Sequence, residues 1–323
     1  MTPRESPRAL AIELAEALRA ELTPHLGGHA GRVHAGAADG GDITFEIDER
    51  AEAFVERFLA DRAPDVAFYS EDRGLALPRG DADWVLVVDP IDGTRPAMAG
   101  LEAACVSVAA APLDSRAPVG GTGSSYSGPT MGDVRTGCVV EIKSGRTFVA
   151  DRGAGLEPAP TMSSNTEVSR MFWSYGLRGR PMRLIAEVIG DLIDASSVGG
   201  GTFDLGSASF DLTRIATGQL DAYVEPGPRI VADIDGVREE FERVGGGALL
   251  NNSPYDLAAA ALIVEEAGGW ITDAYGESLA GRPVLGSGGD FQLSCVAAAT
   301  PELHEAILAA LDTGVERLRQ KVG

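Results

Sequence analysis

The clearest chemical signal is a pair of carboxylates in the segment DPIDGT at 89–94, which directly follows an uninterrupted apolar run at 84–88. Such a run predicts a strand buried on both faces, and the proline after Asp89 would end its hydrogen-bond ladder. Asp89 and Asp92 would then leave the sheet at one strand end, where ligands of α/β sheets bind. The pair indicates a cation site, and the alternative is a turn in which both aspartates merely end the strand.

Two further acidic positions lie in similar contexts. Glu71 and Asp72 follow a short predicted strand that ends at Ser70, and they fit either a solvated acidic turn or further cation ligands. Asp256 stands three residues after Ser253, at the start of an apolar helical pattern. This spacing fits a capping box as well as it fits a metal ligand. The local sequence leaves both roles open at each position.

The elements that must position these residues alternate along the chain. Expected helices are 6–22, 47–59, 180–193, 207–217, 254–267 and 301–318, and expected strands are 66–70, 84–88, 105–111, 138–142, 147–150, 171–175, 196–198, 221–224, 270–272 and 295–298. This alternation predicts a layered α/β architecture. The length of 323 residues favours two lobes, which we expect at 1–155 and 156–323. Because Asp89 and Asp256 fall in different lobes, both lobes would close on one shared site.

The charge of the chain limits its partners. There are 27 Lys and Arg residues against 48 Asp and Glu residues, which gives a formal net charge of −21. Such a field repels nucleic acid and anionic membranes, so neither is an expected partner. It would also repel a phosphorylated small molecule, unless metal ions or backbone donors reverse the sign of the potential locally.

Cysteine usage and hydropathy bear on the compartment. The three cysteines, Cys105, Cys138 and Cys295, lack the spacing of a disulfide framework or a zinc site. The N-terminal segment has no uncharged apolar core of a signal peptide, and no stretch of 18 apolar uncharged residues occurs. We therefore expect a cytoplasmic protein that is neither secreted nor membrane-spanning.

Other catalytic arrangements have little support in the sequence. The histidines are interpreted as surface residues rather than catalysts; they are His25, His29, His34 and His304. The glycine-rich loop GGTGSS at 120–125 lacks the lysine of a P-loop and is interpreted as a flexible connection. We expect no Ser-His-Asp or Cys-His nucleophile.

Five segments together resemble the inositol monophosphatase superfamily over nearly the whole chain. They are GDITFEID at 41–48, YSED at 69–72, WVLVVDPIDGT at 84–94, GSASFDLTRIATGQLDAYVE at 206–225 and YDLAAAALIVEEAGG at 255–269. The resemblance implies an α/β/α/β/α sandwich and a Mg²⁺-dependent phosphoric monoester hydrolase, active as a homodimer. Fructose bisphosphatases, nucleotide-phosphate phosphatases and histidinol phosphatases belong to the same superfamily.

The resemblance also implies roles for individual positions. Two or three Mg²⁺ ions would be held by Glu71, Asp89, Asp92, Asp256 and the carbonyl of Ile91. The attacking water would be activated by the catalytic residues Glu71, Asp48 and Thr94. Phosphate would bind the backbone N–H groups of Gly93 and Thr94, and the polyol or sugar would bind Gly206, Ser207, Ala208 and Glu225. Paired metals suit displacement at phosphorus because they neutralise the entering and leaving oxygens. Ser207 could also serve as a helix N-cap.

The sequence departs from the family pattern around the rim of the site. Arg95 follows DGT where the family usually has another residue, and Tyr255 and Ala260 are unusual residues in the late helix. A lysine that some members have is missing near Ala37. The longest departure is an insertion between Glu225 and Asp256. We expect it to form a lid or subunit contact beside the pocket, with Arg229 or Arg238 available for an anionic group; a solvated surface excursion is the alternative.

The sequence is thus interpreted as a Mg²⁺-dependent phosphatase that hydrolyses a small phosphorylated polyol or sugar, similar to inositol monophosphate, by means of a metal-activated water. One alternative is a phosphatase for another metabolite, such as fructose bisphosphate, a nucleotide phosphate, histidinol phosphate or a specialised biosynthetic intermediate. A second alternative is a regulatory homologue that keeps the fold without turnover.

Overall fold

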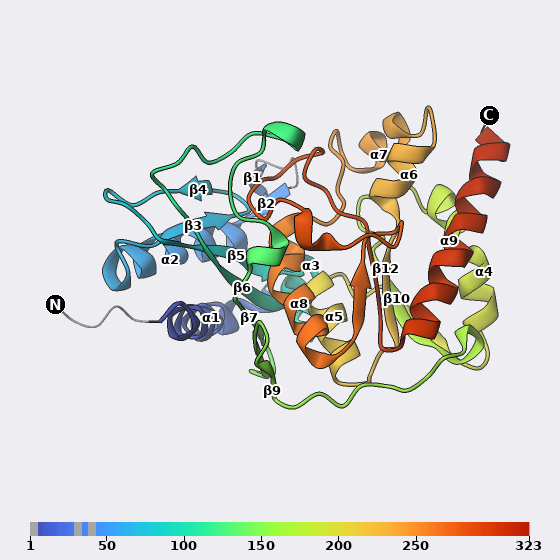
Figure 1. Cartoon of the computed structure of the whole chain (residues 1–323), viewed down its shortest axis with the longest axis horizontal. Coiled ribbons are helices and arrows are strands. Elements are labelled where there is room, and N and C mark those ends of the chain that lie inside the picture. The colour runs from blue at the N-terminus through green and yellow to red at the C-terminus, as the bar shows by residue number, and fades with distance from the viewer. Residues whose placement is uncertain (1–5, 29–33, 38–42, 323) are drawn as a thin grey trace.

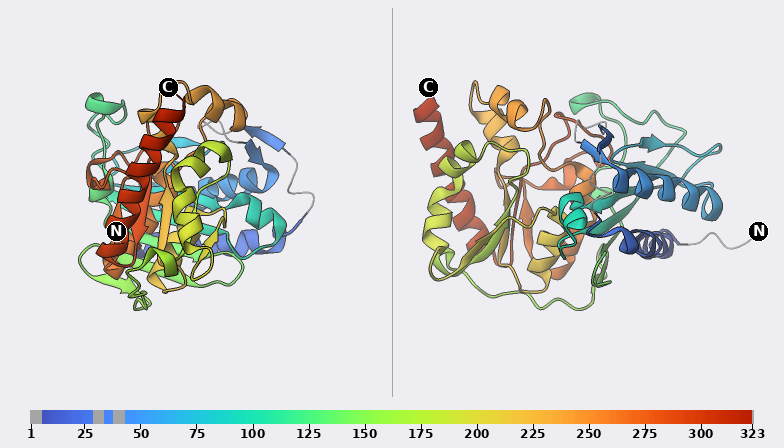
Figure 2. Two further views of the ribbon diagram at one scale, coloured as in Figure 1. Left: turned by 90° about the vertical axis from the view of Figure 1, so that its right-hand side faces the viewer. Right: turned by 180° about the vertical axis from the view of Figure 1, so that it is seen from behind.

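The computed structural model describes residues 6–28, 34–37 and 43–322 of the chain. Two large β-sheets are separated by a pair of helices, and further helices cover both outer faces (Figure 1). The same succession of layers is visible from behind (Figure 2). The layered α/β/α/β/α sandwich predicted from the sequence is confirmed.

The first large sheet is formed by seven strands in the order β4-β3-β5-β6-β7-β8-β9. Their bounds are β3 (Ala67–Ser70), β4 (Gly74–Ala76), β5 (Trp84–Asp92), β6 (Cys105–Pro112), β7 (Thr136–Glu141), β8 (Thr147–Asp151) and β9 (Gly155–Glu157). Its outer face carries α1 (Pro7–Leu22) and α2 (Glu46–Arg62), whose apolar faces pack on the sheet. A separate hairpin, β1 (His34–Ala37) and β2 (Ile43–Phe45), precedes α2. Strand β5 is buried from Val85 to its end, as its apolar run predicts.

The second large sheet has the strand order β11-β10-β12-β14-β13. Its strands are β10 (Phe172–Tyr175), β11 (Gly201–Phe203), β12 (Ala222–Glu225), β13 (Trp270–Thr272) and β14 (Cys295–Ala298). On its outer side α4 (Met182–Ser196) packs against α9 (Pro301–Val322). Between the two sheets lie α5 (Ala208–Ala216) and α8 (Pro254–Ala267), which contact each other. One cluster of buried apolar residues includes members of both sheets, so the two halves share a core.

Helix α8 reaches its central position because its side chains are small. The alanine run at 258–261 is buried, and the helix packs against β6, β7 and β8. A Cβ atom at Gly137 of β7 would lie 2.6 Å from the Ala259 carbonyl oxygen, so glycine is needed where strand and helix meet through their backbones. The first turn of α8, which carries Asp256, is therefore held firmly against the first sheet.

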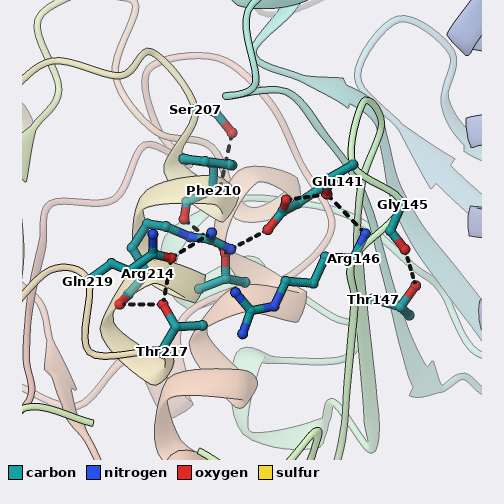
Figure 3. Close-up of polar contacts among 11 residues, drawn as sticks. Glu141, Gly145, Arg146, Thr147, Ser207, Phe210, Arg214, Thr217 and Gln219 are labelled. Atoms are coloured by element: carbon teal, nitrogen blue, oxygen red, sulfur yellow. Dashed lines mark hydrogen bonds and ion pairs between the residues drawn. The ribbon is translucent and has the colours of Figure 1, made fainter. Parts of the chain in front are cut away.

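A buried ion pair fastens α5 to the first sheet. Arg214 of α5 points at Glu141, the last residue of β7, and donates to its carboxylate (Figure 3). The guanidinium carbon lies 4.4 Å from the centre of the Phe210 ring, and Nη1 donates to Gln219 at 2.9 Å. The pair fastens the last turn of α5 to the end of β7, while the helix also packs against α8.

Several elements differ from the sequence predictions. Residues 196–198, predicted as a strand, form the end of α4 and the following turn, and β11 begins only at Gly201. The short elements α3 (Thr94–Ala99), β4 and β9 were not predicted, because three to six residues are too few to show a hydrophobic period. Strand β1 was not predicted either, and it lies between the expected helices 6–22 and 47–59.

The insertion is ordered as two short helices, α6 (Gly227–Asp233) and α7 (Arg238–Val244), which belong to the second sheet's side of the molecule. Phe241 of α7 is fully buried there.

The histidine interpretation holds only in part. His25 is exposed, as expected. His304 is buried, and its Nε2 lies 2.9 Å from the Thr272 hydroxyl, so the prediction of a surface residue is wrong at this position. Its place on the inner face of α9 explains the difference. His29 and the side chain of His34 lie outside the described residues.

Candidate active site

Three carboxylates from two elements meet at the end of strand β5. One oxygen from each of Asp89, Asp92 and Asp256 lies within 4.8 Å of the others, and Asp89 and Asp92 are buried. Oxygen atoms that share one Mg²⁺ ion at about 2.1 Å each can be no more than about 4.2 Å apart, which is close to this spacing. The fold thus brings together, from both halves of the chain, three of the carboxylates that the sequence analysis names as cation ligands.

A β-bulge explains how two aspartates three residues apart reach the same site. In a regular strand such residues point to opposite faces. Here Asp89 pairs with Ser107 while Asp92 pairs with Cys105, so three steps on β5 oppose two steps on β6. The extra residue turns Asp92 back to the side of Asp89, and Pro90 is tolerated because a bulge leaves a backbone group unpaired.

Burial and mutual repulsion dominate the electrostatics of this cluster. Burial raises the pKa of Asp89 well above its ordinary value, and the charges of Asp92, Asp256 and Glu71 add to the effect. Burial likewise raises the pKa of Asp256 to about 7, with the charge of Asp92 as the next cause. The pKa of Asp92 is raised by burial, although the backbone N–H of Ser209 donates to it and opposes the shift. The cluster therefore binds protons tightly unless another cation compensates its charge.

Asp256 caps its helix and at the same time lies in the acidic cluster. Its Oδ2 accepts a hydrogen bond from the Ser253 backbone N–H at 2.6 Å, as in a capping box. Its carboxylate also belongs to the acidic cluster. Glu71 follows β3, which is parallel to β5, and lines the same cavity as Asp89 and Asp256.

A carboxylate and a hydroxyl form a linked pair beside the cluster. Thr94, the first residue of α3, donates from Oγ1 to Asp48 at 2.9 Å, and the same hydroxyl lies 3.3 Å from the Ile91 carbonyl oxygen. The other oxygen of Asp48 accepts from the Phe45 backbone N–H at 2.8 Å, which fixes the carboxylate at the start of α2. The Thr94 oxygen keeps its lone pairs for another donor.

A cavity of about 590 Å³, part of it open to solvent, joins these groups to the second sheet. It is lined by Glu71, Asp89, Ile91, Asp92, Gly93, Thr94, Tyr175, Gly176, Leu177, Arg178, Arg180, Asp204, Gly206, Ser207, Ala208, Asp211, Tyr223, Asn251, Asn252 and Asp256. Gly93 has a φ of 92°, and a Cβ atom there would lie 2.5 Å from the Ala103 carbonyl oxygen, so the turn requires glycine. Ser207 lines the cavity and also caps α5, because its Oγ accepts from the Phe210 N–H at 3.1 Å.

Glu225, which the resemblance places beside the substrate, does not line the cavity. Its side chain is completely buried, and its two oxygens accept from Arg180 and from the Gly227 backbone N–H. The cavity is lined instead by Arg180, in the loop after β10, and by Asn252. The sequence reasoning missed both residues, although Arg180 follows a predicted strand and the strand-end rule could have directed attention to it.

The arginines of the insertion do not reach the cavity. Arg229 is buried and donates to Asp312 at 2.6 Å and to the Ala274 carbonyl at 2.7 Å. Arg238 is exposed and pairs with Glu242. The expectation that either is available for an anionic group in the pocket is therefore wrong, because the insertion folds against α9 and the second sheet. The end of the insertion reaches the cavity through Asn251 and Asn252.

The sequence can now be placed among known proteins. Residues 4–316 match the model of the inositol monophosphatase family. The chain belongs to this family. The family and the relatives named below indicate a phosphoric monoester hydrolase, and the carboxylate oxygens of the acidic cluster are of the kind that a hard divalent cation prefers.

Individual relatives match over most of their length. The chain is 29% identical over 315 residues to a fructose-1,6-bisphosphatase/inositol-1-monophosphatase of Methanothermobacter thermautotrophicus, covering 94% of this chain and 96% of the relative. It is 27% identical to an inositol-1-monophosphatase of Synechocystis, with 84% and 82% covered. It is also 25% identical to a Nus factor SuhB of Xylella fastidiosa, with 73% and 70% covered.

Solved structures show the same fold. An IMPase of Thermotoga maritima superposes with a TM-score of 0.66 at 21% identity, covering 96% of this chain and 98% of that one. The suppressor protein SuhB of Bartonella henselae superposes with a TM-score of 0.67 at 19% identity, covering 95% and 98%. Across the described part of this family member, no helix has both the length and the apolar character needed to cross a membrane.

Proposed function

We propose that the chain is a Mg²⁺-dependent phosphomonoesterase that acts on a small phosphorylated polyol or sugar. The observation that carries this proposal is the convergence of Asp89, Asp92 and Asp256 on a cavity that also contains Glu71 and the Asp48–Thr94 pair. These groups are of the kinds that a metal-assisted phosphate ester hydrolysis would use.

The acidic cluster supports a metal site of two or three ions. Glu71, Asp89, Asp92, Asp256 and the Ile91 carbonyl would hold them, since buried carboxylates with raised pKa values gain most from a cation. Bound Mg²⁺ neutralises charge on the phosphoryl oxygens and makes water more acidic. Because the chain has a net charge of −21, a phosphate site needs such cations to make the local electrostatic potential positive.

The remaining steps use the chain's own groups. Because the Thr94 hydroxyl donates its proton to Asp48, its oxygen is left to accept a hydrogen bond from the attacking water and to hold that water. Glu71 accepts the water's proton as the oxygen bonds to phosphorus. The ester P–O bond breaks with its electron pair on the leaving oxygen, which takes up a proton from solvent. Backbone N–H groups of Gly93 and Thr94 orient the phosphate, and Gly206, Ser207 and Ala208 border the organic part of the substrate.

The direct test is phosphate release by the purified protein with Mg²⁺ from a panel of inositol, fructose, nucleotide and histidinol phosphates. We expect turnover that is lost with EDTA and restored by Mg²⁺. Glu71→Gln should abolish turnover, because the amide cannot accept the water's proton. Absence of turnover on the whole panel, together with stabilisation by Mg²⁺, would instead support the non-catalytic alternative. The similarity to a protein named as a Nus factor is the reason to consider this alternative.

We further propose that the enzyme is a cytoplasmic homodimer without nucleic-acid or membrane partners. Light scattering coupled to gel filtration tests the dimer. Binding of a labelled RNA at physiological salt would contradict the expected absence of nucleic-acid partners.

A further inference from the structure

The second-sheet side of the cavity is built around one buried arginine. We use the name C-terminal wall for the cavity-lining residues Tyr175, Gly176, Leu177, Arg178, Arg180, Tyr223, Asn251 and Asn252. Arg180 is only 6% exposed. Its Nη1 donates to the Arg178 carbonyl at 2.7 Å, and its Nη2 contacts Glu225 and, at 3.4 Å, the Asn252 amide oxygen.

The carboxylate of Glu225 is shielded from any ligand by this arrangement. One oxygen is occupied by Arg180, and the other accepts from the Gly227 N–H at 2.9 Å. A side chain at Gly176 would collide with Glu225 and Arg180, so glycine leaves the space in which the pair fits. The guanidinium is thus fixed between the cavity and the buried carboxylate.

One N–H group of this arginine has no partner. Nε of Arg180 is buried and makes no hydrogen bond to any described residue. A buried donor without a partner costs about 1–3 kcal/mol, so such groups in native structures usually have a ligand or water. Burial lowers the pKa of Arg180 to about 10, so the side chain is still charged at neutral pH.

We infer that Arg180 binds a hydroxyl oxygen of the substrate through this N–H, and that Glu225 is a positioning residue that holds the guanidinium. The inference rests on the proposed function and specifies its substrate class as a phosphate ester with a neutral hydroxyl-bearing group at the C-terminal wall. The family resemblance implies that the carboxylate of Glu225 accepts hydrogen bonds from substrate hydroxyls. In this chain the guanidinium of Arg180 takes its place and donates a hydrogen bond to the substrate instead.

A hydroxyl fits the available groups better than a second phosphate does. The charge of Arg180 is already balanced by Glu225, and one unpaired N–H matches one hydroxyl oxygen, whereas a phosphate needs several donors. The carboxyl groups of Asp204 and Asp211 line the same cavity and outnumber its other arginine, Arg178, so they would oppose a second anion.

The test compares three substrates in the presence of Mg²⁺. These are myo-inositol 1-phosphate, cyclohexyl phosphate, which has the same ring without hydroxyl groups, and fructose 1,6-bisphosphate.

The double variant Arg180→Gln/Glu225→Gln removes the pair without leaving an unpaired buried charge. We expect kcat/KM for inositol 1-phosphate to fall about tenfold, mainly through KM, as for a lost hydrogen bond to a charged donor. The loss on cyclohexyl phosphate should be at least fivefold smaller. Glu225→Gln alone keeps Arg180 but releases the guanidinium from its carboxylate, so its loss on inositol 1-phosphate should be smaller than that of the double variant.

The outcomes separate the inference from the function on which it rests. An equal loss on inositol 1-phosphate and cyclohexyl phosphate would mean that the pair is only structural. Retention of the preference for the hydroxylated ring by Arg180→Gln, which keeps Glu225, would return the contact to Glu225, and a largest loss on fructose 1,6-bisphosphate would assign an anion to Arg180. Wild-type protein that hydrolyses none of the three would refute the proposed function itself. The matched control is Arg238→Gln/Glu242→Gln, an exposed pair outside the cavity, which should leave the substrate preference unchanged.

Discussion

The two sides of the cavity handle buried charge in opposite ways. At the end of β5, burial and repulsion between neighbouring carboxylates raise the pKa values of Asp89 and Asp256. On the C-terminal wall, the buried carboxylate of Glu225 is compensated within the chain by Arg180. This contrast supports the proposal that the first side takes up cations from solution, whereas the charge of the second side is balanced within the chain.

The largest expected effect separates activity from stability at the acidic side. Asp89→Asn should lower kcat by about 10³-fold or more, since a metal ion contributes several kcal/mol to such a reaction. The same substitution should raise the melting temperature of the protein in EDTA, because it removes a carboxyl group that the folded state must either protonate or bury as a charge next to other carboxylates.

Phosphate release and thermal melts with EDTA or Mg²⁺ measure the two effects. A variant that is less stable than wild type in EDTA would contradict the view that this side lacks internal compensation.

The opposite sign is expected on the C-terminal wall. Glu225→Leu leaves the buried charge of Arg180 unpaired and should lower the free energy of unfolding by about 3–5 kcal/mol. Denaturant unfolding measures this loss. Adding Arg180→Met to the variant should restore most of the stability, because an apolar pair can replace a buried ion pair. A double variant that is no more stable than Glu225→Leu would show that the cost is lost packing rather than unpaired charge.

The sequence predicts the acidic side better than the C-terminal wall, because the residues of the acidic side lie in short continuous motifs. The acidic side is encoded by a continuous segment, 89–94, and by a helix start at Asp256, so both the strand and its carboxylates could be predicted. The wall depends on contacts between residues far apart in the chain: Arg180 and Glu225 are 45 positions apart, and Asn252 is 72 positions from Arg180. Nothing in the local sequence shows that the carboxylate of Glu225 turns away from the cavity.

The bulge at Asp89 and Asp92 shows the same limit on a smaller scale. The spacing of the two aspartates suggested a shared site, but a regular strand would have separated them. Only the pairing with β6 reveals the extra residue that brings them together. Likewise, the arginines of the insertion were expected at the pocket because the segment borders it in sequence, while its apolar residues, such as Phe241, anchor it elsewhere.

A buried carboxylate behind the acidic side provides a pH test. Glu52 of α2 accepts from the Ser70 hydroxyl at 2.7 Å and from the Asp72 N–H at 3.1 Å, so it brackets Glu71. Burial raises the pKa of Glu52 from 4.5 to about 7. The folded state therefore binds a proton that the unfolded chain releases at lower pH. The resulting stability is present below about pH 4.5 and is lost as the pH rises through 7.

We expect this one group to change the free energy of unfolding by about 3 kcal/mol between these limits. Glu52→Gln carries no titratable proton, so its difference from wild type should grow in favour of the variant as the pH rises. Urea unfolding in EDTA at several pH values measures this difference. Parallel pH curves for the two proteins would show that Glu52 does not titrate in this range.

The smallest expected effect is a change of fit within the C-terminal wall. Gly176→Ala adds a methyl group where the carboxylate of Glu225 and the guanidinium of Arg180 meet, without altering any charge. Overpacking of this kind costs about 1–3 kcal/mol, and we expect the lower part of that range because the loop after β10 can shift. If Arg180 contacts the substrate, KM for a hydroxylated phosphate ester should rise while the Mg²⁺ concentration for half-maximal activity stays the same.

Gly179→Ala in the same loop is not a matched control, because Gly179 has a φ of 69° and would add backbone strain. Gly190→Ala in α4 meets no atom within 4 Å and serves instead. A changed Mg²⁺ requirement in Gly176→Ala would mean that the two sides of the cavity are coupled. It would contradict the view that the acidic side and the C-terminal wall act independently.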